Sequence, residues 1–151
     1  MTIKSEGRAR PLKPLVRVRP GALLRERSGW ALGARAVDEL YRVAEVLTEG
    51  RCEDDTFFGT TLITIELARA LDGLGVDADP AVLARVRDAI GGSVRVRLRA
   101  MRLAEDDVAR RFPDCTIGTA RTETRFRFED TRLYVDVDLE ASIGRNRAVG
   151  S

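Results

Sequence analysis

The 151-residue chain contains no histidine, and this absence removes several kinds of active site. Histidine is the general base in Ser–His and Cys–His arrangements, so nucleophilic sites of those types are excluded. The sequence also has neither a glycine-rich phosphate loop of the Walker type nor a dinucleotide-binding fingerprint. Catalysis by carboxylates, lysine or tyrosine stays open. The sequence therefore favours a protein that is not an enzyme and that holds no cofactor.

Cysteine is scarce, because Cys52 and Cys115 are the only two in the chain. Two cysteines are too few for the disulfide framework of a small secreted domain. Without histidine they are also too few for the usual ligand set of a zinc site, which is close to excluded. We expect two structural thiols, with a disulfide or a redox pair as the alternative.

Long apolar runs are missing as well. No stretch approaches the roughly 18–20 apolar residues that a membrane span requires. The first 14 residues, MTIKSEGRARPLKP, have no apolar centre of the kind found in a secretory signal. These two absences predict a cytoplasmic protein that does not bind a membrane.

Lysine is nearly absent, whereas arginine is abundant. The 26 basic residues are 24 arginines together with Lys4 and Lys13, a preference that a GC-rich, bacterial-like genome produces without selection. Residues 1–36 hold nine basic and two acidic residues, and the rest of the chain holds 17 basic and 22 acidic residues. A basic N-terminal segment on an acidic body can bind nucleic acid, an acidic protein surface or the body of a neighbouring copy.

The clearest structural pattern is the alternation of apolar or small residues with charged residues between Ala120 and Ala141. Two such runs around a polar break at residues 129–132 predict an antiparallel hairpin. Pairing Phe128 with Leu133 places both apolar sets on one side, as the burial of one face requires. The same register predicts three charged pairs across the strands: Arg125–Asp136, Arg121–Glu140 and Glu123–Asp138.

The acidic strand of this hairpin is a candidate metal site. Asp136 and Asp138 share one strand face, and carboxylates arranged in this way can bind a hard cation such as magnesium. Such a site would belong to a metal-dependent phosphotransfer enzyme. Arg121 and Arg125 neutralise the same face, however, and either can relieve the like-charge pair that Glu123 makes with Asp138. We therefore expect a solvated sheet face without a metal.

Three helices are expected before the hairpin, at Ala34–Thr48, Thr56–Leu71 and Pro80–Ile90. The third has the strongest signals, with Asp79 as its N-cap and proline at its first position. The second is ambiguous, because its Thr60–Ile65 segment has high strand propensity. Alternation predicts further strands at Leu15–Arg19 and Ser93–Arg99. Residues 104–112 are expected to form a short helix or a polar connection.

This order of elements predicts an α+β fold, with about three helices packed on one face of a small antiparallel sheet that ends in a C-terminal β-hairpin. We expect residues 1–13 to be a basic extended arm, residues 14–143 a single α+β domain, and residues 144–151 a flexible tail. The length, together with 44% hydrophobic and 33% charged residues, suits one domain with a core of its own.

Two sets of basic residues are the candidate binding residues. One set lies in the N-terminal segment, and the other forms an arginine stripe if the strand at 93–99 neighbours the strand at 121–127. An arginine stripe can neutralise phosphates, although the low aromatic content of 5% disfavours stacking on single-stranded nucleic acid. The candidate binding residues are Lys4, Arg8, Arg10, Lys13, Arg17, Arg19, Arg95, Arg97, Arg99, Arg121, Arg125 and Arg127.

Three hypotheses about function follow. The first is a non-catalytic interaction or assembly subunit of a cytoplasmic complex, which docks through its basic arm and charged sheet face onto another protein or copies of itself. The second is a module that binds nucleic acid or a phosphate ligand through the arginine stripe. The third, and least favoured, is the metal-dependent phosphotransfer enzyme.

Overall fold

The structure of the chain is a computed structural model that describes residues 23–26 and 29–145. The predicted arm at residues 1–13 and the predicted strand at Leu15–Arg19 lie outside these residues. The first described elements, β1 (Leu23–Glu26) and β2 (Gly29–Leu32), form a two-stranded antiparallel sheet.

The main sheet has four antiparallel strands in the order β3-β4-β6-β5. Its strands are β3 (Glu45–Glu53), β4 (Thr56–Glu66), β5 (Cys115–Glu129) and β6 (Arg132–Arg145). The sheet ends in the predicted C-terminal hairpin. Strand β6 includes the first two residues of the predicted tail, and the rest of that tail lies outside the described residues.

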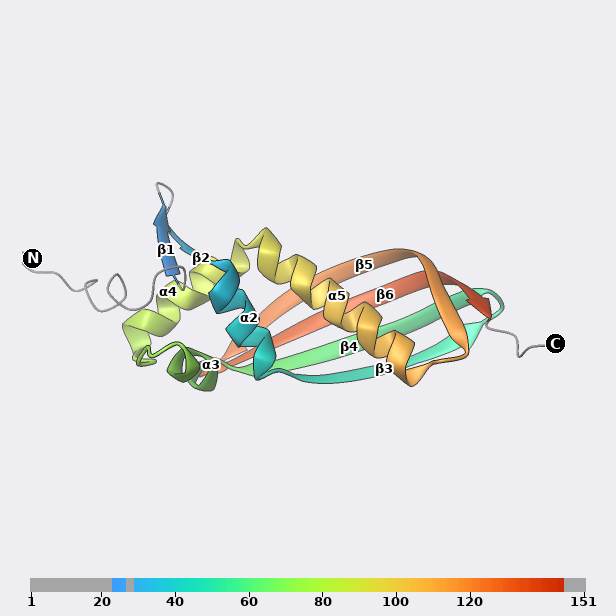
Figure 1. Cartoon of the computed structure of the whole chain (residues 1–151), viewed down its shortest axis with the longest axis horizontal. Helices are drawn as coiled ribbons and strands as arrows, with labels where there is room; N and C mark the ends of the chain where they lie inside the picture. The colour runs from blue at the N-terminus through green and yellow to red at the C-terminus, as the bar shows by residue number, and fades with distance from the viewer. Residues whose placement is uncertain (1–22, 27–28, 146–151) are drawn as a thin grey trace, which may run out of the picture.

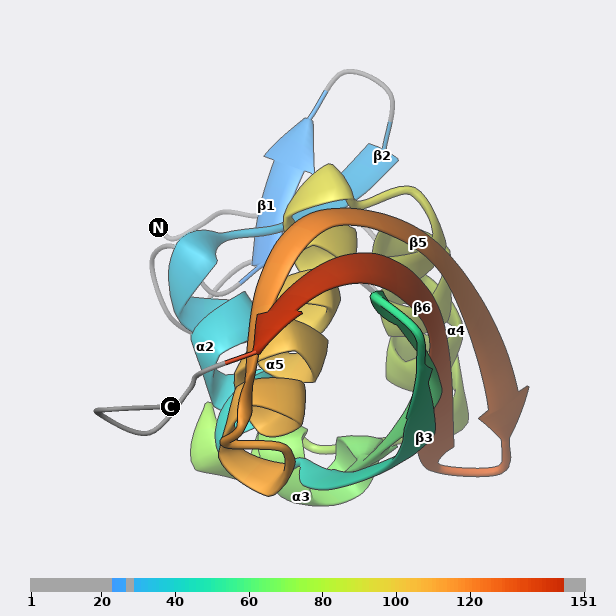
Figure 2. The same ribbon diagram turned by 90° about the vertical axis from the view of Figure 1, so that its right-hand side faces the viewer.

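The described part of the chain has four helices: α2 (Ala34–Arg42), α3 (Leu67–Gly73), α4 (Pro80–Gly91) and α5 (Val94–Arg111). Helix α5 runs along the length of the sheet, and the sheet curves around it (Figures 1 and 2). The other three helices gather at one end of the sheet (Figure 1). The predicted α+β fold, with helices packed on one face of an antiparallel sheet, is confirmed. None of these helices combines the length and apolar character needed to cross a bilayer.

The core fills the space between α5 and the inner face of the sheet, which is the face that points toward α5. Ile63 on β4 and Val135 on β6 are fully buried there, together with Val96 and Ala100 of α5. The hydroxyl of Tyr41 ties α2 to α5 by donating to the backbone oxygen of Val96 at 2.8 Å. Burial raises the pKa of this tyrosine, although Arg99 acts in the opposite direction. The buried phenol therefore stays protonated and keeps its hydrogen bond.

The helix expected at Thr56–Leu71 is wrong, because residues 56–66 form strand β4 and only Leu67–Gly73 is helical. The burial of β4 alternates, with Phe57, Thr61, Ile63 and Ile65 turned inward. Threonine and isoleucine have side chains that pack well on a half-buried pleated surface. The strand propensity of this segment therefore outweighed the apolar pattern that had indicated a helix.

The helix expected at Ala34–Thr48 is correct only in its first part. Helix α2 ends at Arg42, and residues 45–53 form strand β3 on the edge of the sheet. Along β3, Val46 and Thr48 turn toward α5, whereas Leu47 between them is half exposed. A period of two replaces the helical period at this point.

The strand expected at Ser93–Arg99 is also wrong, because these residues open the 18-residue helix α5. Ser93 is the N-cap, and its hydroxyl accepts from the backbone N–H of Val96 at 3.1 Å. The buried residues of α5 recur at four-residue steps, at Val96, Ala100, Ala104 and Val108. Residues 104–112 are expected to form a separate short helix or a connection, but residues 104–111 belong to the second half of α5 and Phe112 is its C-cap.

Two local predictions are confirmed. Asp79 caps α4, and its carboxylate accepts from the backbone N–H of Val82 at 2.9 Å, with proline at the first helical position. The C-terminal hairpin has the predicted register, in which Phe128 pairs with Leu133. The three charged pairs across its strands are also those predicted: Arg125–Asp136, Arg121–Glu140 and Glu123–Asp138.

Candidate functional site

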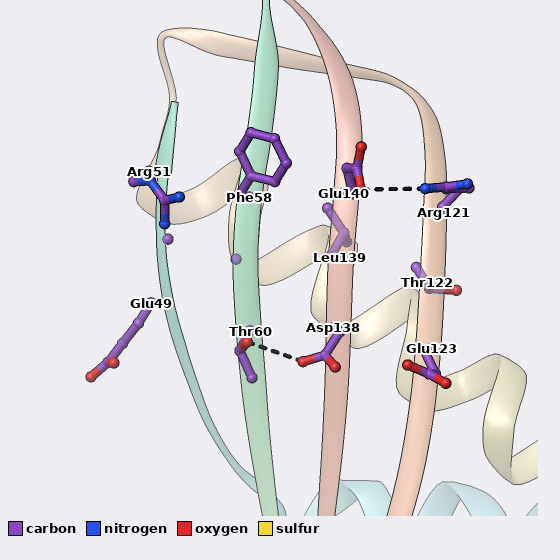
Figure 3. Close-up of a pocket in the computed structure, with 12 residues that line it drawn as sticks. Glu49, Arg51, Phe58, Thr60, Arg121, Thr122, Glu123, Asp138, Leu139 and Glu140 are labelled. Carbon is purple, nitrogen blue, oxygen red and sulfur yellow. Dashed lines mark hydrogen bonds and ion pairs between the residues drawn. The ribbon is translucent and has the colours of Figure 1, made fainter. Parts of the chain in front are cut away.

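The candidate site is the outer face of the sheet, which is the face that points away from α5. Cross-strand registers divide the side chains of the four strands into rows, and alternate rows point to opposite faces. One outer row consists of Glu49, Thr60, Asp138 and Glu123, and the next consists of Arg51, Phe58, Glu140 and Arg121. Figure 3 shows these two rows in front of the strands, with helix ribbon behind them.

Charged residues dominate this face and are unevenly distributed across its strands. Most of the acidic groups lie on β3 and β6, whereas three of the arginines lie on β5. Together the nine carboxylates and five guanidinium groups give the face a net negative charge. The carboxylates are Glu45, Glu49, Glu53, Glu66, Glu123, Glu129, Asp136, Asp138 and Glu140, and the guanidinium groups belong to Arg51, Arg121, Arg125, Arg127 and Arg132.

The two rows line a hollow of about 880 Å³ that all four strands contribute to. Four carboxylates, two arginines, the ring of Phe58 and two threonines are at its surface, so it offers both ionic and apolar contacts (Figure 3). The Arg51 guanidinium lies 5.5 Å from the centre of the Phe58 ring. The lining residues are Glu49, Gly50, Arg51, Phe58, Gly59, Thr60, Arg121, Thr122, Glu123, Asp138, Leu139 and Glu140.

Ion pairs organise the β6–β5 side of the hollow. Arg125 reaches Asp138 at 2.9 Å and Glu123 at 3.4 Å, so it relieves the repulsion between these two opposed carboxylates diagonally, as one of the sequence interpretations proposed. Arg121 lies 3.5 Å from Glu140 (Figure 3). These pairs are largely exposed, and exposed pairs typically contribute only about 0–1 kcal/mol each. The face is therefore held together by the strands rather than by its charges.

A pair of glycines supports the hollow from the inner side of the sheet. Gly50 on β3 faces Gly59 on β4, and the ring of Phe57 packs against both. A Cβ atom would lie 2.4 Å from this ring at Gly50 and 2.5 Å from it at Gly59. The ring also packs edge-on against Phe112, which follows α5, with ring centroids 5.1 Å apart. Any larger residue at either glycine would displace the buried aromatic ring.

A buried polar cluster joins the sheet to the C-terminal half of α5. The carboxylate of Asp107 is only 4% exposed and accepts from the hydroxyl of Thr48 at 2.6 Å and from Nε of Arg111 at 2.7 Å. It also binds Arg110, and the Thr48 and Thr61 hydroxyls lie 2.8 Å apart. Sequence reasoning missed this cluster, although an aspartate in step with the apolar positions of α5 was a signal that could have revealed it.

Asp107 is held in its charged form. Burial raises the pKa of this carboxyl, but hydrogen bonds from Thr48, Arg111 and Arg110 and the charge of Arg111 outweigh burial. The net result is a pKa below the ordinary aspartate value. A carboxylate with a lowered pKa cannot serve as a general acid near neutral pH. We therefore interpret this cluster as part of the scaffold.

The structure separates the candidate binding arginines into two groups. Arg121, Arg125 and Arg127 share the outer face of β5, as predicted. The other three lie on α5, so the predicted stripe across a sheet is wrong. Arg95 is exposed, Arg97 donates to the backbone oxygen of Thr124, and Arg99 pairs with Asp38. The candidates in the N-terminal segment lie outside the described residues: Lys4, Arg8, Arg10, Lys13, Arg17 and Arg19.

No protein-family model matches this chain, and neither does any curated protein or solved structure. Within residues 23–26 and 29–145, no three side chains of histidine, cysteine, aspartate or glutamate are grouped so that they could hold a metal ion. The two carboxylates of the candidate metal site, Asp136 and Asp138, have basic and hydroxyl neighbours. Asp138 accepts from Thr60 at 3.1 Å and pairs with Arg125, and Asp136 lies opposite Arg125.

Proposed function

We propose that this protein is a non-catalytic assembly subunit, in which the outer face of one copy binds the basic N-terminal segment of another copy. The observation that carries the proposal is the hollow on a sheet face that no described helix covers. A monomer has no structural need for a hollow that combines carboxylates, arginines and an aromatic ring. A partner segment could fill it and bury the ring of Phe58.

Charge complementarity supports this choice of occupant. The hollow has four carboxylates and two arginines at its surface, whereas the proposed arm at residues 1–13 holds four basic residues and one acidic residue. Opposite potentials of this kind favour encounter and set the register of two surfaces. Two copies can exchange such contacts reciprocally, so one type of contact is sufficient for a symmetric dimer.

The same charges favour a protein over a nucleic acid as the partner. Phosphate binding needs basic groups that are not already neutralised. On the outer face, carboxylates pair with Arg121 and Arg125, and Arg127 pairs with Glu129. Nucleic-acid or phosphate binding remains the alternative function, and it would depend on the basic residues of the N-terminal segment.

The proposal of a non-catalytic role rests on composition. The chain has no histidine, and its two lysines both lie within the first 13 residues. The proposed setting is the cytoplasm.

Size-exclusion chromatography with light scattering tests the proposal. We expect the full chain to form a discrete oligomer at about 0.05 M salt and to dissociate near 0.5 M, because salt screens exposed charges. Deletion of residues 1–13 should give a monomer at both salt concentrations. The Glu49→Lys substitution reverses a charge at the hollow and should raise the dissociation constant about tenfold or more.

Asp77→Lys is the matched control, since it makes the same charge change at an exposed position between α3 and α4. This variant should associate like the wild type. A monomer at every salt concentration would overturn the proposed self-association. Absorbance at 260 nm that elutes with the full chain, and disappears when residues 1–13 are removed, would replace it with the nucleic-acid function.

A further inference from the structure

The only two cysteines of the chain meet in the folded molecule. Cys52 lies near the end of β3 and Cys115 begins β5, and their sulfur atoms are 3.4 Å apart. These strands are the two outer strands of the sheet, so their approach depends on the curvature of the sheet around α5 (Figure 2). Both side chains are thiols in this structure.

The surroundings hold the two thiols in a fixed position. They belong to an apolar cluster that includes Phe57, Phe112 and Ala141. The backbone N–H of Cys115 donates to the backbone oxygen of Phe112 at 3.1 Å, which ties the start of β5 to the end of α5. Cys115 is only 8% exposed, whereas Cys52 is partly exposed and is the thiol that solvent can reach.

The distance between the thiols is compatible with bond formation. A disulfide requires a sulfur–sulfur distance of about 2.05 Å, so the two atoms must approach by roughly 1.4 Å. Rotation of the two side chains and a small strand adjustment can supply this movement.

We propose that Cys52 and Cys115 are an oxidative modification site that forms a reversible intramolecular disulfide on exposure to a peroxide. The thiolate of Cys52 attacks one peroxide oxygen, which gives a sulfenic acid and releases the other oxygen as water. The thiolate of Cys115 then attacks the sulfenic sulfur, forms the S–S bond and releases a second water. In sum, two thiols and one hydrogen peroxide yield one disulfide and two waters, and a dithiol reverses the step.

The disulfide would join the two edges of the curved sheet at this end of the molecule. It closes a loop that includes β4 and helices α3, α4 and α5. It also anchors the start of β5, where the pairing with β6 shifts register between Ile117 and Ala120. Oxidation should therefore stabilise the fold, because the cross-link restricts the unfolded chain.

Intact-mass spectrometry of the full chain tests this inference. The reduced protein is treated with hydrogen peroxide, and remaining thiols are alkylated. We expect a mass loss of about 2 Da with no alkylation, and a linked pair of peptides containing both cysteines. The thermal midpoint should rise by about 5–10 °C, and dithiothreitol should restore both the mass and the original midpoint.

Cys52→Ser and Cys115→Ser are matched controls, since each keeps the side-chain size and leaves one thiol. Neither variant should lose mass as a monomer, and peroxide should not raise the thermal midpoint of either. Three outcomes in the wild type would overturn the inference: two thiols that still accept alkylation, added oxygen on separate cysteines, or disulfides between molecules. The mass change does not depend on whether the protein associates through the outer face of the sheet.

Discussion

At the scale of single residues, the carboxylate of Asp107 is the side chain from which we expect a large effect on stability. Among the residues whose burial is described, it is the one charged residue that is buried, and it connects three hydrogen-bond donors from two elements. A buried carboxylate is tolerated only when its partners replace the water that it has lost. Thr48, Arg110 and Arg111 supply that replacement where α5 meets β3.

We therefore predict that Asp107→Asn lowers the free energy of unfolding at pH 7 by about 2–4 kcal/mol. The amide keeps the shape of the carboxylate but loses its charge, so Arg110 and Arg111 lose their negatively charged partner. Urea unfolding followed by circular dichroism measures the change. Asp106→Asn, at an exposed neighbouring position, should change stability by less than about 0.5 kcal/mol. Equal losses in the two variants would contradict the role given to Asp107.

The effect of Asp107 should depend on pH in a defined direction. Its pKa in the folded protein is lower than the ordinary value of 3.8, so the charged form contributes stability above that pH. This contribution is lost as the pH falls through the folded pKa. The difference in stability between the wild type and Asp107→Asn should stay constant from about pH 7 to 5 and shrink below about pH 4. A difference that grows on acidification would contradict the assignment.

At the scale of elements, competing periodicities decided which segments became helices. Residues 93–99 alternate like a strand, yet Val96 also begins a longer apolar pattern, which repeats every four residues as far as Val108. Forming the helix has a cost, because Val94 and Leu98 are left 68% and 57% exposed on it. The apolar burial along the 18 residues of α5 outweighs the strand-like alternation of seven residues. The helical pattern becomes visible only when the whole 18-residue segment is considered.

The pairing of β3 with β4 depends on Gly50 and Gly59, which face each other beneath the hollow. We predict that Gly59→Ala lowers the free energy of unfolding by about 1–3 kcal/mol. Its Cβ would lie 2.5 Å from the ring of Phe57 and 2.9 Å from the backbone oxygen of Glu49, so both the ring and a strand must shift. Thermal and urea unfolding measure the change.

Gly91→Ala is the control for this prediction. Gly91 is the last residue of α4, and a Cβ there would meet nothing within 4 Å. Alanine should be neutral or stabilising at this position by up to about 1 kcal/mol, because it has a higher helix propensity than glycine. If the two alanine variants are equally stable, the packing argument for the glycine pair is wrong.

At the scale of the whole molecule, α5 holds both edges of the sheet that curves around it. Arg111 donates to the backbone oxygen of Val46 on β3 at 3.3 Å, and Arg97 donates to that of Thr124 on β5 at 2.9 Å. The Arg97 guanidinium also lies 5.1 Å from the centre of the Phe126 ring. An arginine from the helix therefore donates to a backbone oxygen on each of the two edge strands.

We predict that Arg97→Ala lowers the free energy of unfolding by about 1–2 kcal/mol, because it removes a hydrogen bond and a contact with an aromatic ring. Amide hydrogen exchange should also become faster along β5. Arg95→Ala, which removes an exposed arginine of the same helix, should change neither quantity measurably. Loss of partner binding in the Arg97 variant with unchanged stability would instead support a role for Arg97 as a binding residue.

What the sequence determined by itself was local. Alternation in the C-terminal hairpin set its register to the residue, because a slip by one position would bury Arg125 and Asp136. A capping aspartate followed by proline located the start of α4. Composition alone excluded histidine-based chemistry. These predictions depend on near neighbours in the chain, where the side-chain pattern and the backbone geometry are directly linked.

Only the tertiary structure decided which residues meet across the fold. It placed Asp107 against Thr48, brought Cys52 to Cys115, and moved Arg97 from a predicted sheet surface to the edge of β5. Each of these contacts depends on how far the sheet curves around α5, and that curvature results from packing over the whole core. No local sequence pattern predicts this curvature, because the residues in each contacting pair lie 27 or more positions apart in the chain.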